Sequence, residues 1–204
     1  MEKSYTAYHA ADNAAEMLQN AGYTELFEHK EMKIERGGKY FVRRGGSSLI
    51  AFNTDYCGEY AFRIIASHLD SPALKLKYNP VVKTGSAAKL NTETYGGGIY
   101  STFLDVPLKI AGRIYLEKDG EITSETYTDA HEYVIPNVAI HMNRSLNDGY
   151  KYNPQVDLLP LFGINADADY FAKLGTDGAR TVGYDLYAVN ATKPFFAGAN
   201  DEFY

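Results

Sequence analysis

Apolar residues in the N-terminal part of the chain recur first at helical intervals and then at strand intervals. Between residues 4 and 20 they repeat every three or four positions, which predicts a helix there that Gly22 ends. Two apolar runs, residues 40–42 and 49–52, flank a Gly-Gly pair, and this pattern is typical of a β-hairpin. We therefore expect a helix followed by a pair of antiparallel strands.

The next apolar run, residues 62–67, predicts a buried strand. Apolar and polar residues alternate there, and Ile65 makes the second face partly apolar, which favours the interior of a sheet. Pro72 cannot donate a ladder hydrogen bond, so the strand is expected to end near it. His68 and Asp70 lie two positions apart and would share one face at the C-terminal end of this strand.

An imidazole beside a carboxylate suits a functional site. The carboxylate of Asp70 can accept the proton of one ring nitrogen of His68, which leaves the other nitrogen free as a metal ligand or a base. A His-x-Asp pair is also common as an ordinary loop or core pair. An alternative interpretation is a hydrolase that uses this pair together with Ser67 or Ser71 as the nucleophile. Neither serine lies in a Gly-x-Ser-x-Gly context.

After Pro72 the pattern changes to short strand-like runs broken by Gly, Asn, Asp and Pro. The Asp119-Gly120 pair predicts a hairpin turn, and residues 185–189 predict a late strand. An apolar run at residues 138–141 also predicts a strand, with His141 at its end. A β-rich module between two α/β-like ends is typical of an inserted domain.

Composition excludes several classes of function. The 204 residues are 45% hydrophobic and 23% charged, as in ordinary globular proteins. A net charge of −6 without a basic run argues against nucleic-acid binding. No apolar stretch is long enough to span a membrane, and the start of the chain lacks the apolar core of a signal peptide. With Cys57 as the single cysteine, we expect a cytoplasmic protein.

Several segments, taken together and in order, resemble the aspartyl aminopeptidase family of zinc metallopeptidases. Ser67-His68-Leu69-Asp70-Ser71-Pro72 is similar to its His-Thr-Asp-Ser-Pro motif, with Leu69 in place of threonine. Tyr100, Phe103 and Val106 depart from residues that the family favours. The other segments that carry the resemblance are residues 95–105 (Tyr-Gly-Gly-Gly to Asp), 111–113 (Ala-Gly-Arg), 135–144 (Ile-Pro to His-Met-Asn-Arg), 153–160 and 198–203.

The resemblance implies an α/β fold: part of a metallopeptidase α/β domain, interrupted by a β-rich inserted dimerisation domain. On this basis residues 1–75 are expected to form the N-terminal part of the metallopeptidase domain and residues 76–184 the dimerisation domain. Residues 185–204 would return into the metallopeptidase domain. The family's enzymes remove an N-terminal residue, often Asp or Glu, from peptides, and they assemble into homo-oligomers through the inserted domain.

The resemblance also assigns roles to residues and implies a zinc cofactor, with two ions in the complete enzyme. His68 is expected to be a metal ligand, and Asp70 is expected to act in catalysis by orienting its imidazole. His141 is expected to bind substrate in the active site of a partner subunit. Peptides and further copies of the chain are the expected partners, with no nucleic acid and no membrane.

Members of that family are much longer than this chain, and their remaining metal ligands and catalytic glutamates would lie beyond Tyr204. A dinuclear zinc site needs several protein ligands and a general base. We therefore expect the chain to be an N-terminal fragment that is inactive alone. The alternative is a non-catalytic oligomerisation or interaction protein derived from such an enzyme.

Overall fold

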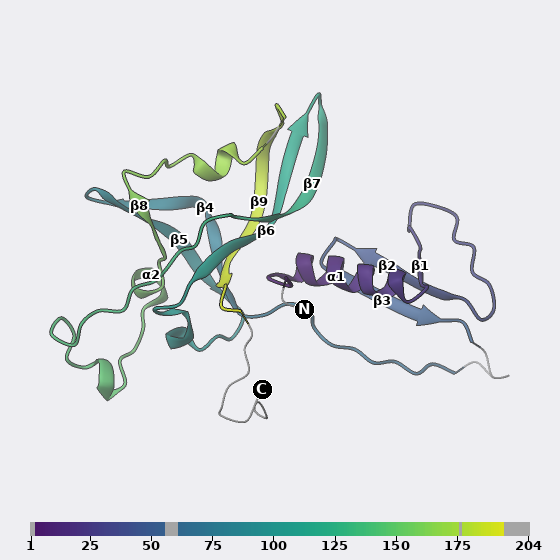
Figure 1. The fold of residues 1–204 in the computed structure, drawn as a ribbon, viewed down its shortest axis with the longest axis horizontal. Coiled ribbons are helices and arrows are strands. Elements are labelled where there is room, and N and C mark those ends of the chain that lie inside the picture. The colour runs from purple at the N-terminus through teal and green to yellow at the C-terminus, as the bar shows by residue number, and fades with distance from the viewer. Residues whose placement is uncertain (1–2, 56–60, 176, 194–204) are drawn as a thin grey trace. The chain divides into compact units, whose positions relative to one another are not determined.

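The computed structural model describes residues 3–55, 61–175 and 177–193, which form two compact units (Figure 1). The first unit ends at Ser71, and the second begins at Pro72. The assignment of residues 1–75, 76–184 and 185–204 to parts of a metallopeptidase stays a prediction. The mixture of one long helix with two sheets confirms an α/β chain in which strands predominate.

The first unit is a helix on a small sheet. Helix α1 (Ala7–Asn20) agrees with the predicted helix, and β2 (Lys39–Arg44) pairs antiparallel with β3 (Ser48–Asn53) as the predicted hairpin. The short strand β1 (Thr24–Glu25) adds in parallel beside β2. Residues 45 and 46 both have positive φ, a conformation that glycine adopts without steric cost, so the turn needs the Gly-Gly pair.

Small side chains and one arginine hold α1 to this sheet. Ala11 and Ala15 are buried one turn apart, so they form a narrow apolar face on the helix. The guanidinium of Arg43 on β2 contacts Glu25 Oε1 at 2.7 Å and Asp12 Oδ1 at 2.9 Å. It therefore links the helix to both neighbouring strands.

The strand expected over residues 62–67 is absent, and this prediction was wrong. Residues 61–71 form no secondary structure, and the side chains of Phe62, Ile64 and Ile65 are 86%, 83% and 100% exposed. A strand needs a neighbour that completes its hydrogen-bond ladder. Among the described residues, none of the strand pairings includes this run, so its alternation lacks the sheet that would bury it.

The second unit is built on a six-stranded antiparallel sheet with the order β7-β6-β9-β4-β5-β8 (Figure 1). The Asp119-Gly120 turn joins β6 to β7 with positive φ at both residues, as predicted for a hairpin. The strand predicted at residues 185–189 lies within β9, which pairs with both β6 and β4. The strands are β4 (Ala73–Thr84), β5 (Ala87–Tyr95), β6 (Leu108–Lys118), β7 (Glu121–Thr128), β8 (Leu161–Ile164) and β9 (Arg180–Asn190).

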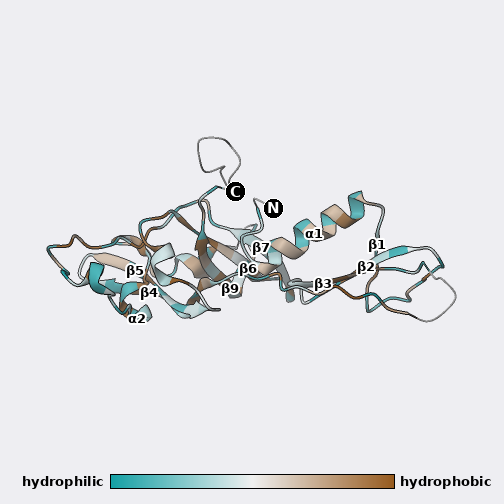
Figure 2. Ribbon diagram, turned by 90° about the horizontal axis from the view of Figure 1, so that it is seen from below, coloured by the Kyte–Doolittle hydropathy of each residue, from teal (hydrophilic) through white to brown (hydrophobic). Residues whose placement is uncertain are grey.

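One face of this sheet carries the core of the unit. Alternate residues of its central strands point inward, as in Leu108, Ile110 and Ile114 of β6. Figure 2 shows hydrophobic residues in brown around β6 and β9. The connecting segments close over this face and add further buried residues, which include Phe103, Tyr133, Ile135, Leu158 and Phe171.

The connections contain short helices: η1 (Tyr100–Phe103), η2 (Leu146–Asp148), α2 (Pro154–Asp157) and η3 (Tyr170–Lys173). The prediction of a strand at residues 138–141 was wrong, because this segment forms an exposed loop and turn. The strand-like pairing lies just before it, at residues 133–135. In the described part of the chain, none of the helices has the length and apolar character needed to cross a bilayer.

Candidate functional site

His68 and Asp70 form the predicted pair in the first unit, although the segment that carries them has no regular secondary structure. The Nδ1 atom of His68 lies 3.0 Å from Oδ1 of Asp70 and 2.8 Å from its carbonyl oxygen. Both partners are acceptors, so Nδ1 must carry the proton and donate it. In the neutral imidazole this leaves the lone pair on Nε2, and the His68 side chain is 81% exposed.

This arrangement has the donor chemistry of one zinc ligand. Zinc binds neutral imidazole nitrogen, and a histidine ligand commonly donates its other N–H to a carboxylate or a carbonyl. Within residues 3–55, 61–175 and 177–193, His, Cys, Asp and Glu side chains do not gather in groups of three that could hold a metal ion. His68 and Asp70 therefore fit one arm of a metal site. The segment 198–203, which carries part of the resemblance, lies outside the described residues.

The Tyr-Gly-Gly-Gly segment turns tightly beside Pro72 in the second unit. A side chain at Gly98 would meet both the Phe103 ring and the Pro72 ring at 3.4 Å. Gly96 has φ +73, and a Cβ there would lie 3.5 Å from the Cα of Pro72. The positive φ of Gly96 is what favours glycine in this segment, because a Cβ at Gly96 or Gly98 would make only ordinary contacts with Pro72.

His141 lies at the tip of an exposed loop, residues 136–144. The N–H of Met142 donates to the carbonyl of Ala139 at 2.8 Å and closes a turn with His141 at its third position. The apolar side chains of Val138, Ile140 and Met142 are exposed around it, at 45%, 43% and 80%. Exposed apolar residues grouped beside a hydrogen-bonding side chain are typical of a surface that meets another molecule. Arg144 is exposed on the same loop.

A cluster around Asp129 was missed by sequence reasoning. The side chain of Asp129 is fully buried, and its Oδ2 accepts hydrogen bonds from the hydroxyls of Tyr127, Tyr133 and Tyr170 at 3.3, 3.1 and 2.9 Å. Its Oδ1 accepts the backbone N–H and the Nδ1–H of His131, both at 2.8 Å. The available sequence signal was the recurrence of Tyr127, Asp129, His131 and Tyr133 at every second position.

Electrostatics at this cluster favour the ionised carboxylate. Burial by itself raises the pKa of Asp129, but the hydrogen bonds from His131, Tyr170 and Tyr133 outweigh it and lower the pKa below its ordinary value. Burial and the neighbouring charge of Asp129 raise the pKa of Tyr133. The tyrosines therefore stay protonated and serve as donors.

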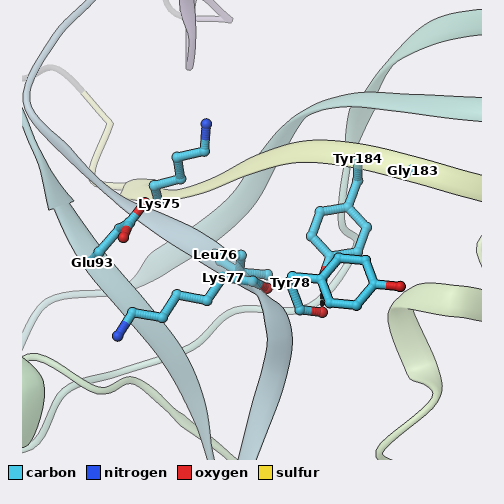
Figure 3. A pocket seen from close by; sticks show the side chains of 7 residues that line it. All are labelled: Lys75, Leu76, Lys77, Tyr78, Glu93, Gly183 and Tyr184. Carbon is cyan, nitrogen blue, oxygen red and sulfur yellow. Dashed lines mark hydrogen bonds between the residues drawn. The ribbon is translucent and has the colours of Figure 1, made fainter.

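A pocket of about 370 Å³ opens on the second unit where β4 leaves its register with β5 (Figure 3). The hydroxyl of Tyr184 donates to the carbonyls of Lys77 and Tyr78 at 2.9 and 3.0 Å and holds this irregular strand in place. The pocket is lined by Lys75, Leu76, Lys77, Tyr78, Glu93, Gly183 and Tyr184, with the charged side chains on one side and the tyrosine rings on the other (Figure 3). The predicted site residues are not part of this lining.

Comparison with known protein families gives one match that covers nearly the whole chain. Residues 1–201 match the model of a family described as "Aminopeptidase I zinc metalloprotease (M18)". The chain is 40% identical to a probable M18 family aminopeptidase 2 of Clostridium acetobutylicum, over 98% of this chain and 50% of that protein. It is 34% identical to a probable aspartyl aminopeptidase of Ricinus communis, over 91% of this chain and 39% of that protein.

Solved structures agree with these sequence comparisons. The cryo-EM structure of the Ape4 and Nbr1 complex contains a chain that matches with a TM-score of 0.86 and 29% identity, over 98% of this chain and 44% of that chain. The present chain thus spans about half the length of the curated relatives that it matches.

Proposed function

Because this chain belongs to the M18 family of zinc aminopeptidases, we propose that it is the N-terminal portion of an enzyme that removes N-terminal, acidic residues from peptides. One observation carries this proposal: His68 keeps Nε2 free at the surface, with Asp70 holding the proton on Nδ1. The pair supplies one metal ligand, and the described residues contain no group of three that would complete a site. We propose that the chain is inactive without the rest of that enzyme.

Within this function His68 would hold one of two zinc ions through Nε2. When bound, zinc polarises the scissile carbonyl and lowers the pKa of a bound water. Asp70 orients the imidazole and fixes its tautomer, which makes Nε2 the better donor. The exposed run at residues 62–65 supports the same proposal, because a strand with these residues needs a sheet supplied by further polypeptide.

His141 would bind substrate in the active site of a partner subunit, and the enzyme would be a homo-oligomer. The exposed apolar loop around His141 supports this role, since it offers both a hydrogen-bond donor and a surface for docking. Arg144 would attract an acidic N-terminal side chain. We further propose a cytoplasmic location, on the ground of the single cysteine.

The test compares this 204-residue chain with a polypeptide extended to the length of its relatives. Hydrolysis of aspartyl, glutamyl and alanyl anilides is measured with zinc present and after chelation. We expect the extended polypeptide to cleave the acidic substrates and the present chain to cleave none. Zinc-dependent hydrolysis by the present chain alone would disprove the fragment proposal.

In the extended polypeptide the variant Asp70→Asn tests the role of the carboxylate. Removing the partner of a zinc-bound histidine typically costs about 10–100-fold in metal affinity or activity. Asp148→Asn, an exposed carboxylate on η2, is the matched control and should leave both unchanged. Equal zinc affinity in Asp70→Asn and the parent would exclude Asp70 from the site.

A non-catalytic oligomerisation protein is the second candidate. The second unit has its own continuous core and an exposed apolar loop, so it can fold and dock without a catalytic centre. This candidate predicts a stable oligomer of the present chain that holds no zinc. A monomer in sedimentation would contradict the second candidate, whereas zinc-dependent hydrolysis by the extended polypeptide would favour the first.

A further inference from the structure

Asp105 has a left-handed backbone conformation, with φ +57, between η1 and β6. Aspartate tolerates this conformation better than most residues, so its presence there is compatible with the local backbone. The backbone alone does not explain the carboxylate, because glycine would satisfy the same φ at no steric cost. The side chain must therefore be explained by what it contacts.

Two hydrogen bonds tie Asp105 to the base of the loop that carries His141. Its N–H donates to the carbonyl of Ile135 at 3.0 Å, and its Oδ1 accepts the N–H of Asn137 at 2.8 Å. Leu104, the preceding residue, forms a parallel bridge with Ile135, which is 2% exposed. Asp105 thus bonds to the residues before and after Pro136, and it connects the base of the loop to the buried Ile135.

From this base, local hydrogen bonds lead to the histidine. The side-chain oxygen of Asn137 accepts the N–H of Val138 at 2.9 Å, and the turn closed by Met142 and Ala139 follows at once. His141 is therefore four residues from the backbone group that Asp105 holds. The side chains of residues 138–142 are exposed, so they supply little packing, and the direction of the loop depends on its base.

We infer that Asp105 is a positioning residue, which orients the loop 136–144 so that His141 can reach substrate. This inference rests on the substrate-binding role proposed for His141. It adds a residue that touches neither substrate nor metal and acts through the hydrogen bond to Asn137. A bond from a backbone N–H to an ionised carboxylate is stronger than one between neutral groups, which suits the anchor of an exposed loop.

Two substitutions at position 105 distinguish the effect of the side-chain acceptor from the effect of the left-handed backbone. Asp105→Gly removes the carboxylate and keeps the left-handed backbone free of strain. Asp105→Asn keeps both the conformation and a carbonyl acceptor. Asp119→Gly is the matched control, because Asp119 has nearly the same φ, +54, in the turn between β6 and β7.

The experiment measures kcat and KM of these variants in the extended polypeptide, alone and combined with His141→Ala. We expect Asp105→Gly to raise KM about tenfold or more, with kcat changed less, since it removes a charge-assisted hydrogen bond that orders a binding group. Asp105→Asn should restore KM to within about threefold, and Asp119→Gly should match the parent. A loss of folded enzyme would instead lower kcat and leave KM unchanged.

The double variants decide between the two proposals. If Asp105 acts through His141, adding Asp105→Gly to His141→Ala should change KM by less than about twofold. The inference is overturned if Asp105→Gly raises KM equally in the parent and in His141→Ala, or if it raises KM in neither. This conclusion holds provided that His141→Ala alone impairs the enzyme. If His141→Ala itself behaves like the parent, the proposed role of His141 is the one that fails.

Hydrogen exchange on the present chain supplies an independent check. Asp105→Gly should speed exchange of the Asn137 amide and leave the Leu108 amide, which bonds to Tyr133 at 2.8 Å, as protected as in the parent. Unchanged protection at Asn137 overturns the inference even if the kinetic variant is poorly folded.

Discussion

The hydroxyl of Tyr170 donates a 2.9 Å hydrogen bond to Oδ2 of Asp129 and so joins η3 to the segment that follows β7. The two residues come from distant parts of the chain, and the buried carboxylate collects further donors from Tyr127, Tyr133 and His131. A buried carboxylate that lost these donors would be costly, so the cluster ties the connections of the second unit to one another.

Replacing Asp129 by asparagine should destabilise the chain by about 1–3 kcal/mol at pH 7, because the amide cannot accept from every donor around it. The folded-state pKa of Asp129 is below its ordinary value, so the unfolded chain binds the proton more tightly. The stabilisation is fully present above the unfolded pKa of about 3.9 and is lost as pH falls through the lower folded pKa.

Urea unfolding between pH 7 and pH 2 measures this effect. The free energy of unfolding should fall more steeply toward low pH in the parent than in Asp129→Asn. Asp148→Asn is exposed and should keep the slope of the parent. Parallel curves for the parent and Asp129→Asn would contradict the role assigned to the carboxylate.

Gly112 of the Ala-Gly-Arg segment should not tolerate a side chain. Its φ is +155, and a Cβ there would lie 2.0 Å from the carbonyl oxygen of Asp185 on β9. Gly112→Ala must therefore push β6 away from β9 at the centre of the sheet, at a cost of about 3 kcal/mol or more. A thermal melt compares it with Gly97→Ala, where no heavy atom lies within 4 Å. Equal melting temperatures for the two variants would refute this account.

Ile65→Glu should leave the stability of the present chain within about 0.5 kcal/mol, because the side chain is fully exposed. Ile114→Ala, in the core on β6, should cost about 2–5 kcal/mol in the same urea titration. In the extended polypeptide Ile65→Glu should become destabilising if residues 62–67 enter a sheet. A neutral effect in both forms would argue against that burial.

Local chemistry made several features of this chain predictable. The two hairpin turns need residues that accept positive φ, and the Gly45-Gly46 and Asp119-Gly120 pairs supply them within the turn itself. His68 and Asp70 are two residues apart, so their side chains can meet without the support of a sheet. In both cases the interacting groups are close in sequence and need no distant partner.

Burial and long-range contacts depended on the tertiary structure. The alternation at residues 62–67 shows which face of a strand would be apolar, but a neighbouring strand decides whether that strand forms. The meeting of Asp129 with Tyr170, and of Asp105 with Asn137, depends on how the connections fold across the sheet. Sequence by itself thus determined the turns, the helix and the His-Asp pair, because these rest on neighbouring residues. Only the tertiary structure decided what is buried and what holds the His141 loop, because those contacts join residues far apart in the chain.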